Sequence, residues 1–199
     1  MRLAVSLAVF VSATALAAGV SPGAAAPDFK LKDLSGKTVS LADFKGKVVV
    51  LEWFNPECPY VKASHTRGSL VGLAKKVSAD GVVWLAVNSG GPGKQGAGLE
   101  KSKAGLKTFG LDNAVLLDES GEVGKAYGAT NTPHLFVISK DGKLAYAGAI
   151  DNSPDGEKEN PEGGKLVNYV EQALADVAAG KPVRVPATKA YGCSVKYGS

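Results

Sequence analysis

One stretch, residues 47–62 (KVVVLEWFNPECPYVK), constrains the fold more than any other part of the chain. Its first half is apolar and rich in β-branched residues, interrupted only by Glu52, which is typical of a buried central strand. A break at 55–57 follows, and then Cys58 and Pro59. Because proline is favoured at the first helical position, we expect a helix from Tyr60 to about Ala79 with Cys58 at or beside its N-cap.

The position of Cys58 predicts a reactive thiol. The first turn of a helix has unpaired backbone N–H groups and the positive end of the helix dipole, and both favour a thiolate. The thiolate is the form of cysteine that attacks disulfides and peroxides. Cys58 is therefore the candidate catalytic nucleophile.

Size and charge narrow the function classes. The chain has 199 residues, of which 45% are hydrophobic and 21% charged, as in an ordinary globular domain with a core of its own. The formal net charge is +4, without a basic block. We find no RNP-like or helix-turn-helix pattern, so nucleic acid is not an expected partner.

Residues 1–26 have the pattern of a signal peptide. Arg2 precedes an apolar, alanine-rich stretch that ends in small residues of the A-x-A type. We therefore expect an exported protein, periplasmic or secreted, without stable membrane insertion after cleavage. An uncleaved N-terminal anchor is the alternative.

The remaining pattern predicts one α/β domain over residues 27–179 and a C-terminal tail over 180–199. Apolar strands alternate with helical segments, which indicates a mixed central sheet with helices on both faces. The expected elements are a β-hairpin at 27–40, a short helical turn at 41–44, strands at 47–54, 82–87 and 114–117, helices at 60–79 and 99–109, a short helix ending near 127, a strand after Thr132-Pro133, a hairpin turn at Asp141-Gly142 and a helix at 166–179.

Several of these segments together resemble the redoxin branch of the thioredoxin superfamily, which includes AhpC/TSA peroxiredoxin-like proteins and exported TlpA/ResA-like thioredoxins. The matching segments are 27–29 (PDF), 36–41 (GKTVSL), 44–51 (FKGKVVVL), Cys58-Pro59 and Thr132-Pro133. The resemblance implies a thioredoxin-like fold with an N-terminal β-hairpin extension. It also implies a cis Pro133 against the reactive sulfur, with Pro59, Thr132, Pro133 and Asn55 positioning the substrate.

The chain departs from both well-understood classes of this superfamily. Thioredoxin-like reductases have C-x-x-C, but Val61 stands where the second cysteine belongs. Peroxiredoxins have Thr or Ser three residues before the reactive cysteine and a proline further upstream, where this chain has Asn55 and Leu51. The sequence therefore leaves disulfide exchange and peroxide reduction both open.

Cys193 is the second cysteine of the chain and our candidate resolving thiol. It follows Gly192 in a tail that we expect to be flexible and exposed, with the glycine allowing close approach to another surface. The hypothesis is that Cys58 attacks and Cys193 resolves through a transient disulfide. A permanent structural bridge and no contact between the two are the alternatives. The expected partners are protein thiols or disulfides, or hydroperoxides, together with an unidentified thiol reductant.

Two functions of other kinds compete with this interpretation. Cys58, His65, His134 and Cys193 are residue types that bind Cu(I) or Zn(II) if the fold gathers them, although Lys62 replaces the second cysteine of copper-delivering C-x-x-x-C proteins. The other is a non-catalytic binding domain. For the redox function the sequence implies no cofactor and no metal. His65 is expected to be a surface or packing residue, and His134 lies nearer the site.

Overall fold

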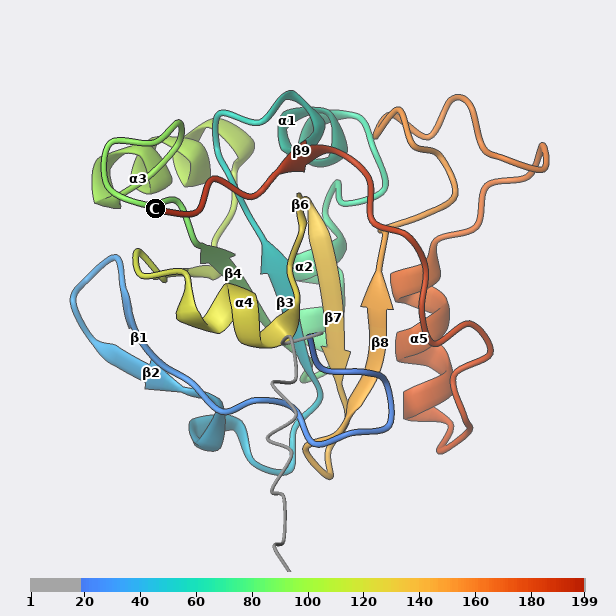
Figure 1. The fold of residues 1–199 in the computed structure, drawn as a ribbon. Helices are drawn as coiled ribbons and strands as arrows, with labels where there is room; N and C mark the ends of the chain where they lie inside the picture. Colours follow the sequence, from blue (N-terminus) through green and yellow to red (C-terminus); the bar gives the residue numbers. More distant parts are fainter. Residues whose placement is uncertain (1–18, 199) are drawn as a thin grey trace, which may run out of the picture.

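The computed structural model describes residues 19–198 (Figure 1). Helices and strands alternate through the first two thirds of the chain, and a long irregular segment separates α5 from the last strand. In chain order the elements are β1 (Lys30–Asp33), β2 (Thr38–Ser40), η1 (Leu41–Phe44), β3 (Val49–Trp53), α1 (Pro59–Thr66), α2 (Leu73–Ala79), β4 (Val83–Asn88), α3 (Leu99–Phe109), β5 (Ala114–Leu117), α4 (Glu122–Tyr127), β6 (Asn131–Thr132), β7 (His134–Ile138), β8 (Leu144–Gly148), α5 (Tyr169–Ala178) and β9 (Cys193–Ser194).

Seven strands form one mixed sheet in the order β2-β1-β5-β4-β3-β7-β8. The central strands β3, β4 and β5 are parallel, as the helical segments between them require, and β7 and β8 add antiparallel at one edge. The predicted hairpin of β1 and β2 extends the sheet at the other edge. The α/β class, the mixed sheet and the N-terminal hairpin are thus confirmed.

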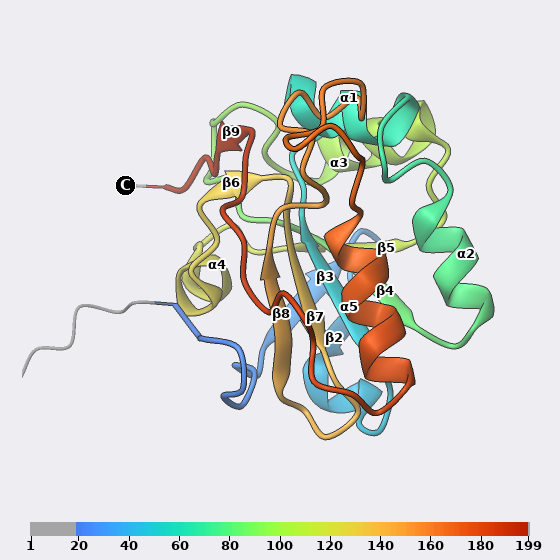
Figure 2. The same ribbon diagram turned by 90° about the vertical axis from the view of Figure 1, so that its right-hand side faces the viewer.

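Helices cover both faces of the sheet (Figure 2). Figure 2 shows α2 and α5 on one side and α4 on the other. Successive residues from Val48 to Trp53 point to opposite faces of the sheet and enter two different hydrophobic cores. Val48 and Val50 pack in the core beneath α2 and α5, whereas Val49, Leu51 and Trp53 pack in the core beneath α4. Because both faces are covered, every residue of β3 is buried, including Glu52.

The helix that we predicted over residues 60–79 is wrong as a single element. The structure has two helices, α1 and α2, separated by residues 67–72. A Cβ at Gly68 would lie 2.1 Å from the carbonyl oxygen of Gly156, so this turn is held against the loop after β8. Gly72 has a φ of 68°, a left-handed conformation that interrupts a helix. Gly68 and Gly72 therefore lie in the turn between the end of α1 and the start of α2.

The first described residues pack against the domain. Val20 N donates to Ala126 O at 3.2 Å, Gly23 N to Leu144 O at 2.7 Å and Ala26 N to Gly142 O at 2.9 Å. These residues belong to the segment 1–26 that we assigned to a signal peptide, and residues 1–18 of that segment lie outside the described part. Between residues 19 and 198, none of the helices combines the length and apolar character needed to span a bilayer.

Candidate functional site

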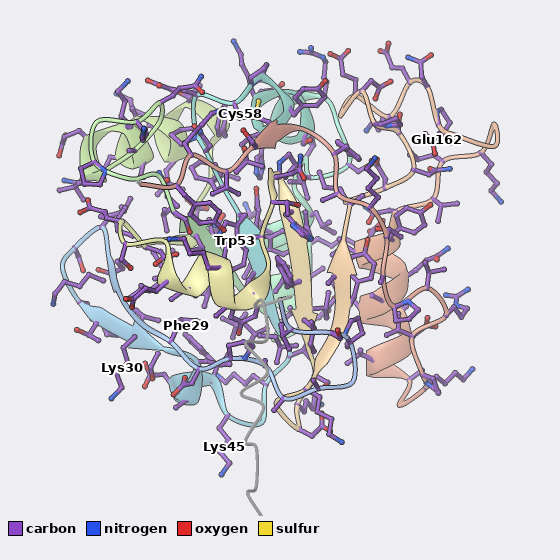
Figure 3. All side chains as sticks on the ribbon, in the orientation of Figure 1. Phe29, Lys30, Lys45, Trp53, Cys58 and Glu162 are labelled. Atoms are coloured by element: carbon purple, nitrogen blue, oxygen red, sulfur yellow. The ribbon has the colours of Figure 1, made fainter. Side chains whose placement is uncertain are left out.

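Cys58 occupies the position that the sequence predicts, at the junction of β3 and α1. It is the N-cap of α1 with extended backbone angles (φ −78°, ψ 124°), and Pro59 is the first helical residue. Its side chain is 0% exposed. Figure 3 shows Cys58 at the end of the sheet near the start of α1, beyond Trp53. The candidate nucleophile is therefore at a helix start, as expected, but it is enclosed.

The segment before β7 provides the partner of the Cys58 thiol. The Thr132–Pro133 peptide bond is cis, as the resemblance implied. The Cys58 Sγ donates a hydrogen bond to the Thr132 carbonyl oxygen at 3.1 Å, and Thr132 is itself 2% exposed. The structure therefore brings Cys58, Pro59, Thr132 and Pro133 into one site.

Cys193 reaches the same site from the end of the chain. Strand β9 pairs antiparallel with β6, and Cys193 lies directly opposite Thr132. Its side chain packs against the cluster that contains Cys58, and both cysteines are free thiols. Of the three arrangements considered from the sequence, the one without contact between the cysteines is excluded.

Gly192 allows this approach. It has a φ of 104°, and a Cβ on it would lie 2.4 Å from the carbonyl oxygen of Thr132. Only glycine fits both the conformation and the space. The glycine beside Cys193 therefore does what the sequence suggested: it lets the tail lie against the Thr132–Pro133 segment.

The tail is fixed rather than exposed and flexible, which corrects our expectation. Val195 N donates to Thr130 O at 3.0 Å, Gly91 N donates to Lys196 O at 2.8 Å, and the Tyr197 hydroxyl donates to Ala129 O at 2.7 Å. The sequence pattern did not indicate these partners, because most of them are backbone groups of distant loops.

The neighbouring Cys58 affects the ionisation of Cys193. Burial, followed by the hydrogen bond and the charge of Cys58, raises the pKa of Cys193 to about 11, against an opposing effect of Lys196 and of the Tyr60 backbone. At neutral pH Cys193 is therefore protonated while it lies beside Cys58.

Asn55 and Glu57, which precede Cys58 in the sequence, bind groups of the loop before α3 through their side chains. The Asn55 side chain accepts from Glu57 N at 2.9 Å and donates to Gln95 O at 3.2 Å. The Glu57 carboxylate pairs with Lys101 and accepts from Gly96 N at 2.8 Å. The Lys101 hydrogen bond, opposed by desolvation and reinforced by Gly96 N, lowers the pKa of Glu57. Both side chains thus tie the start of α1 to the loop before α3, and a substrate-positioning role for Asn55 stays a prediction.

The two histidines have different surroundings. His65 Nε2 lies 2.7 Å from Glu52 Oε1, and Trp84 Nε1 donates to Glu52 Oε2 at 3.0 Å, so His65 is a packing residue in a buried polar cluster. His134 follows the cis proline and accepts from Thr130 N through Nδ1 at 3.3 Å. Burial lowers the pKa of His134 to about 4, so it is neutral at pH 7.

The metal-binding alternative finds no support in the geometry. Within residues 19–198, no group of three or more His, Cys, Asp or Glu side chains is arranged to hold a metal ion. Cys58 and Cys193 meet, but His65 is paired with Glu52 on the strand side of α1.

Sequence comparison agrees with this geometry. The Redoxin family model matches residues 21–163. A thiol-disulfide oxidoreductase named ResA from Geobacillus thermodenitrificans is 35% identical over 126 residues, covering 63% of this chain and 67% of that protein. The chain thus spans about two thirds of the length of this curated relative.

Two solved structures are similar over almost the whole chain. A hypothetical protein from Sinorhizobium meliloti has a TM-score of 0.76 at 28% identity and covers 91% of this chain and 97% of its own. An uncharacterized conserved protein from Geobacillus kaustophilus has a TM-score of 0.75 at 31% identity, covering 89% of this chain and 92% of its own. The likeness to these two structures therefore extends well beyond the segment matched by the family model.

Proposed function

The chain belongs to the Redoxin family within the thioredoxin superfamily, and from this premise we propose that it is a thiol-disulfide oxidoreductase that uses Cys58 as nucleophile and Cys193 as resolving thiol. One observation carries the proposal. Cys58 and Cys193 approach the Thr132–Pro133 segment from opposite ends of the chain and lie beside each other there. Cys193 thereby supplies the second thiol that Val61 does not.

The proposed reaction has two exchange steps. The Cys58 thiolate attacks one sulfur of a substrate disulfide, forming a mixed disulfide and releasing the first substrate thiolate. The Cys193 thiolate then attacks Cys58 Sγ, forming the Cys58–Cys193 disulfide and releasing the second substrate thiolate. The substrate gains two electrons, the protein loses two, and an external thiol reductant restores both cysteines.

The pKa of Cys193 favours this order. Two of the causes that raise it are the hydrogen bond and the charge of Cys58. Both vanish when Cys58 Sγ becomes part of a mixed disulfide, while Lys196 still acts to lower the pKa of Cys193. Cys193 therefore ionises more readily once Cys58 has reacted, when a resolving thiolate is required.

Access to Cys58 requires a movement of the tail. Cys58 is 0% exposed, and β9 lies opposite Thr132 beside it. Strand β9 is only two residues long, and for it to move, the hydrogen bonds of Val195, Lys196 and Tyr197 that fix the tail must break as well. We propose that β9 leaves β6 when substrate enters and returns when Cys193 attacks.

Disulfide exchange is favoured over peroxide reduction on one structural ground. Peroxide reduction needs a hydrogen-bond donor beside the sulfur, and Asn55 is the residue at the position that peroxiredoxins use. Asn55 Nδ2 donates one of its two hydrogens to Gln95 O, and Oδ1 accepts from Glu57 N, so the amide is held by the start of α1 and the loop before α3.

The test is to treat reduced protein with bis(2-hydroxyethyl) disulfide and to follow the products by intact mass. Wild type is expected to lose two hydrogens and end as the internal disulfide. Cys193→Ser is expected to keep one mercaptoethanol adduct on Cys58, because nothing resolves the mixed disulfide. Cys58→Ser is the matched control and is expected to form no internal disulfide.

Two outcomes contradict the proposal. Wild type that retains both thiols shows that Cys58 does not exchange, and Cys193→Ser that releases the adduct as fast as wild type shows that Cys193 does not resolve. A parallel reaction with hydrogen peroxide distinguishes disulfide exchange from peroxide reduction. If the Cys58 thiol reacts much faster with peroxide than with the disulfide, the protein is a peroxidase.

We also propose export, with cleavage earlier than residue 26. Removal of residues 1–26 would delete the contacts that Val20, Gly23 and Ala26 make with the domain. Ala15-Leu16-Ala17 also has the A-x-A pattern, and the family match begins at residue 21. The expected N-terminus of the exported protein is therefore Ala18, to be checked by N-terminal sequencing of the periplasmic or secreted fraction.

A further inference from the structure

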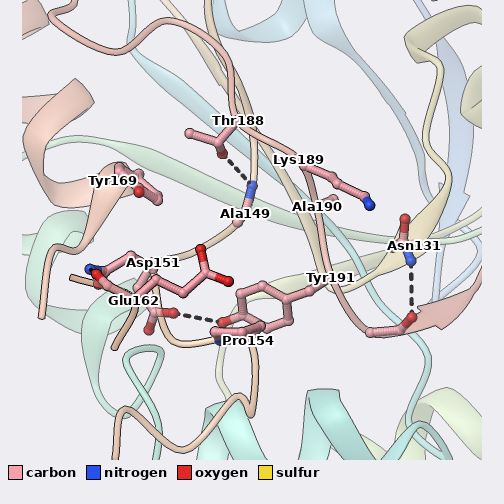
Figure 4. Close-up of a pocket in the computed structure, with 12 residues that line it drawn as sticks. Asn131, Ala149, Asp151, Pro154, Glu162, Tyr169, Thr188, Lys189, Ala190 and Tyr191 are labelled. Atoms are coloured by element: carbon pink, nitrogen blue, oxygen red, sulfur yellow. Dashed lines mark hydrogen bonds between the residues drawn. The ribbon is translucent and has the colours of Figure 1, made fainter. Parts of the chain in front are cut away.

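A cavity of about 460 Å³ lies beside the two-cysteine site, between the loop after β8 and the C-terminal tail (Figure 4). The loop contributes Ala149, Asp151 and Glu162, and the tail contributes residues 188–192. Figure 4 shows Asp151 and Glu162 on one side of the cavity and Lys189 on the other.

Asp151 is the feature of this cavity that the fold does not explain. Its side chain is 2% exposed, and its Oδ1 accepts from the Tyr191 hydroxyl at 2.8 Å and from Ser153 N at 2.9 Å. Its Oδ2 has no hydrogen-bond partner. Buried carboxylate oxygens are nearly always paired, because an unpaired buried charge is costly. An unpaired oxygen on the wall of a cavity indicates a donor that enters from outside.

The charge around the cavity selects the kind of donor. The loop from 151 to 162 contains five acidic residues and one lysine, a net charge of −4. Asp151 and Glu162 line the cavity, against Lys189 as the lining cation. Asp151 is buried, which strengthens its attraction for a cation, and Glu162 adds an exposed negative charge at the same cavity. A positively charged hydrogen-bond donor, an ammonium or a guanidinium group, is therefore the complementary ligand.

The cavity is close to the reacting sulfurs. Gly192 and Asn131 line it, and Asn131 Nδ2 donates to Gly192 O at 2.9 Å. Gly192 precedes Cys193, and Asn131 precedes Thr132, whose carbonyl oxygen binds the Cys58 thiol. The wall of the cavity therefore includes the residue immediately before the resolving cysteine.

We propose that this cavity binds an ammonium or guanidinium group of the disulfide substrate, so that the protein selects positively charged substrates. This inference rests on the proposed thiol-disulfide exchange and adds the class of substrate. The cation belongs either to a small aminothiol disulfide or to a Lys or Arg side chain beside the cysteine of a polypeptide.

The first experiment compares three symmetric disulfides of similar length: cystamine (cationic), bis(2-hydroxyethyl) disulfide (neutral) and dithiodiglycolate (anionic). Each rate of oxidation of the reduced protein is divided by the rate with free dithiothreitol, which corrects for intrinsic reactivity. Wild type is expected to prefer cystamine over the neutral disulfide about tenfold, and the anionic one is expected to be slowest.

Acid-to-amide variants test the assignment to this cavity. Glu162→Gln and Asp151→Asn are each expected to reduce the preference for cystamine to about twofold. Glu159→Gln is the matched control, because Glu159 is an exposed acid of the same loop and does not line the cavity. A second pair of substrates, disulfide-linked peptides with Lys or norleucine beside the cysteine, distinguishes the two sources of the cation. The inference would be overturned if wild type showed equal corrected rates for the three small disulfides and also for the Lys and norleucine peptides.

A binding measurement separates this inference from the proposed function. Propane-1,3-diamine has no sulfur, and its binding to Cys58→Ser is followed by the backbone amide NMR shifts of Ala149 and Ala190. We expect saturable shifts whose midpoint moves to a higher diamine concentration in Glu162→Gln. Normal disulfide exchange without diamine binding overturns the cavity assignment alone. Diamine binding without exchange in wild type overturns the proposed function and leaves the cation site standing.

Discussion

Glu52 and Asp151 are both buried carboxylates, but their surroundings differ. Glu52 is 0% exposed in the central strand β3, and its two oxygens are bonded to His65 and Trp84. Asp151 is 2% exposed at the end of the sheet, and one of its oxygens has no partner. The first carboxylate is enclosed by the fold, whereas the second borders a cavity.

The difference separates a structural from a binding role. A buried carboxylate whose donors are all supplied by the protein contributes to the stability of one arrangement, and its removal leaves those donors unpaired. A buried carboxylate with an unpaired oxygen weakens the fold and is retained where a ligand completes it. The two positions should therefore respond in opposite ways to the same substitution.

The largest effect is expected at Glu52. Glu52→Ala leaves His65 Nε2 and Trp84 Nε1 without an acceptor and opens a void beside them in the buried polar cluster. We expect a loss of about 3–5 kcal/mol in the free energy of unfolding, measured by urea denaturation. Glu52→Gln keeps one acceptor but presents an NH₂ group to the other donor, so its expected cost is smaller, about 2 kcal/mol.

A double variant sharpens this prediction. Replacing both Glu52 and His65 by leucine removes the acceptor together with one of its two donors and leaves only Trp84 Nε1 unpaired, so it should recover part of the stability that Glu52→Ala loses. Glu159→Ala, at an exposed acid, is expected to change stability by less than about 0.5 kcal/mol. A loss at Glu52 no greater than that at Glu159 would contradict a structural role for the buried cluster.

The two histidines extend the comparison, because His65 has a carboxylate partner and His134 has none. Burial lowers the pKa of His134 from 6.5 to about 4. Between these values the unfolded chain binds more protons than the folded protein, so stability falls as the pH is lowered from about 6.5 to about 4. The difference of 2.5 pKa units corresponds to about 3 kcal/mol in total.

The pH dependence of His134→Asn provides the control for this prediction. Asparagine retains an acceptor for Thr130 N but does not titrate, so the stability difference between wild type and variant should narrow as the pH falls through this window. Carboxylates contribute to both proteins alike and cancel in the difference. A difference that is constant from pH 7 to pH 4 would show that His134 is not buried in its neutral form.

Local patterns predicted the elements around Cys58, and they did so for physical reasons. Residues 47–54 are apolar enough to be a central strand, and Pro59 sets the start of α1. The chemistry beside them was also visible, since Cys58 is at the helix start and Thr132–Pro133 is cis. These features depend on neighbours within a few residues, or on motifs that the Redoxin family shares.

Features that depend on distant contacts were not predictable in this way. The break between α1 and α2 depends on Gly68 meeting Gly156, 88 positions along the chain. The fixed tail depends on backbone groups of two separate loops, at Gly91 and at 129–130. In the sequence, Asp151 is one of several acids in an acidic loop, and nothing there indicates that it is buried. Its burial depends on Tyr191 of the distant tail, whose hydroxyl donates to it. A single sequence gives no signal for such pairs, and so the cavity beside Cys193 was missed.

The smallest effect is expected for Asp151→Asn, the same acid-to-amide change as Glu52→Gln. Asparagine keeps the Oδ1 acceptor for Tyr191 and Ser153, and its NH₂ replaces the oxygen that lacks a partner. The variant also removes a buried charge, so the free energy of unfolding should stay unchanged or rise by up to about 1 kcal/mol. Urea denaturation of both variants side by side measures the contrast directly. A loss at Asp151 as large as that at Glu52 would mean that the Asp151 carboxylate is held by the fold, and the case for a ligand in the cavity would then fail.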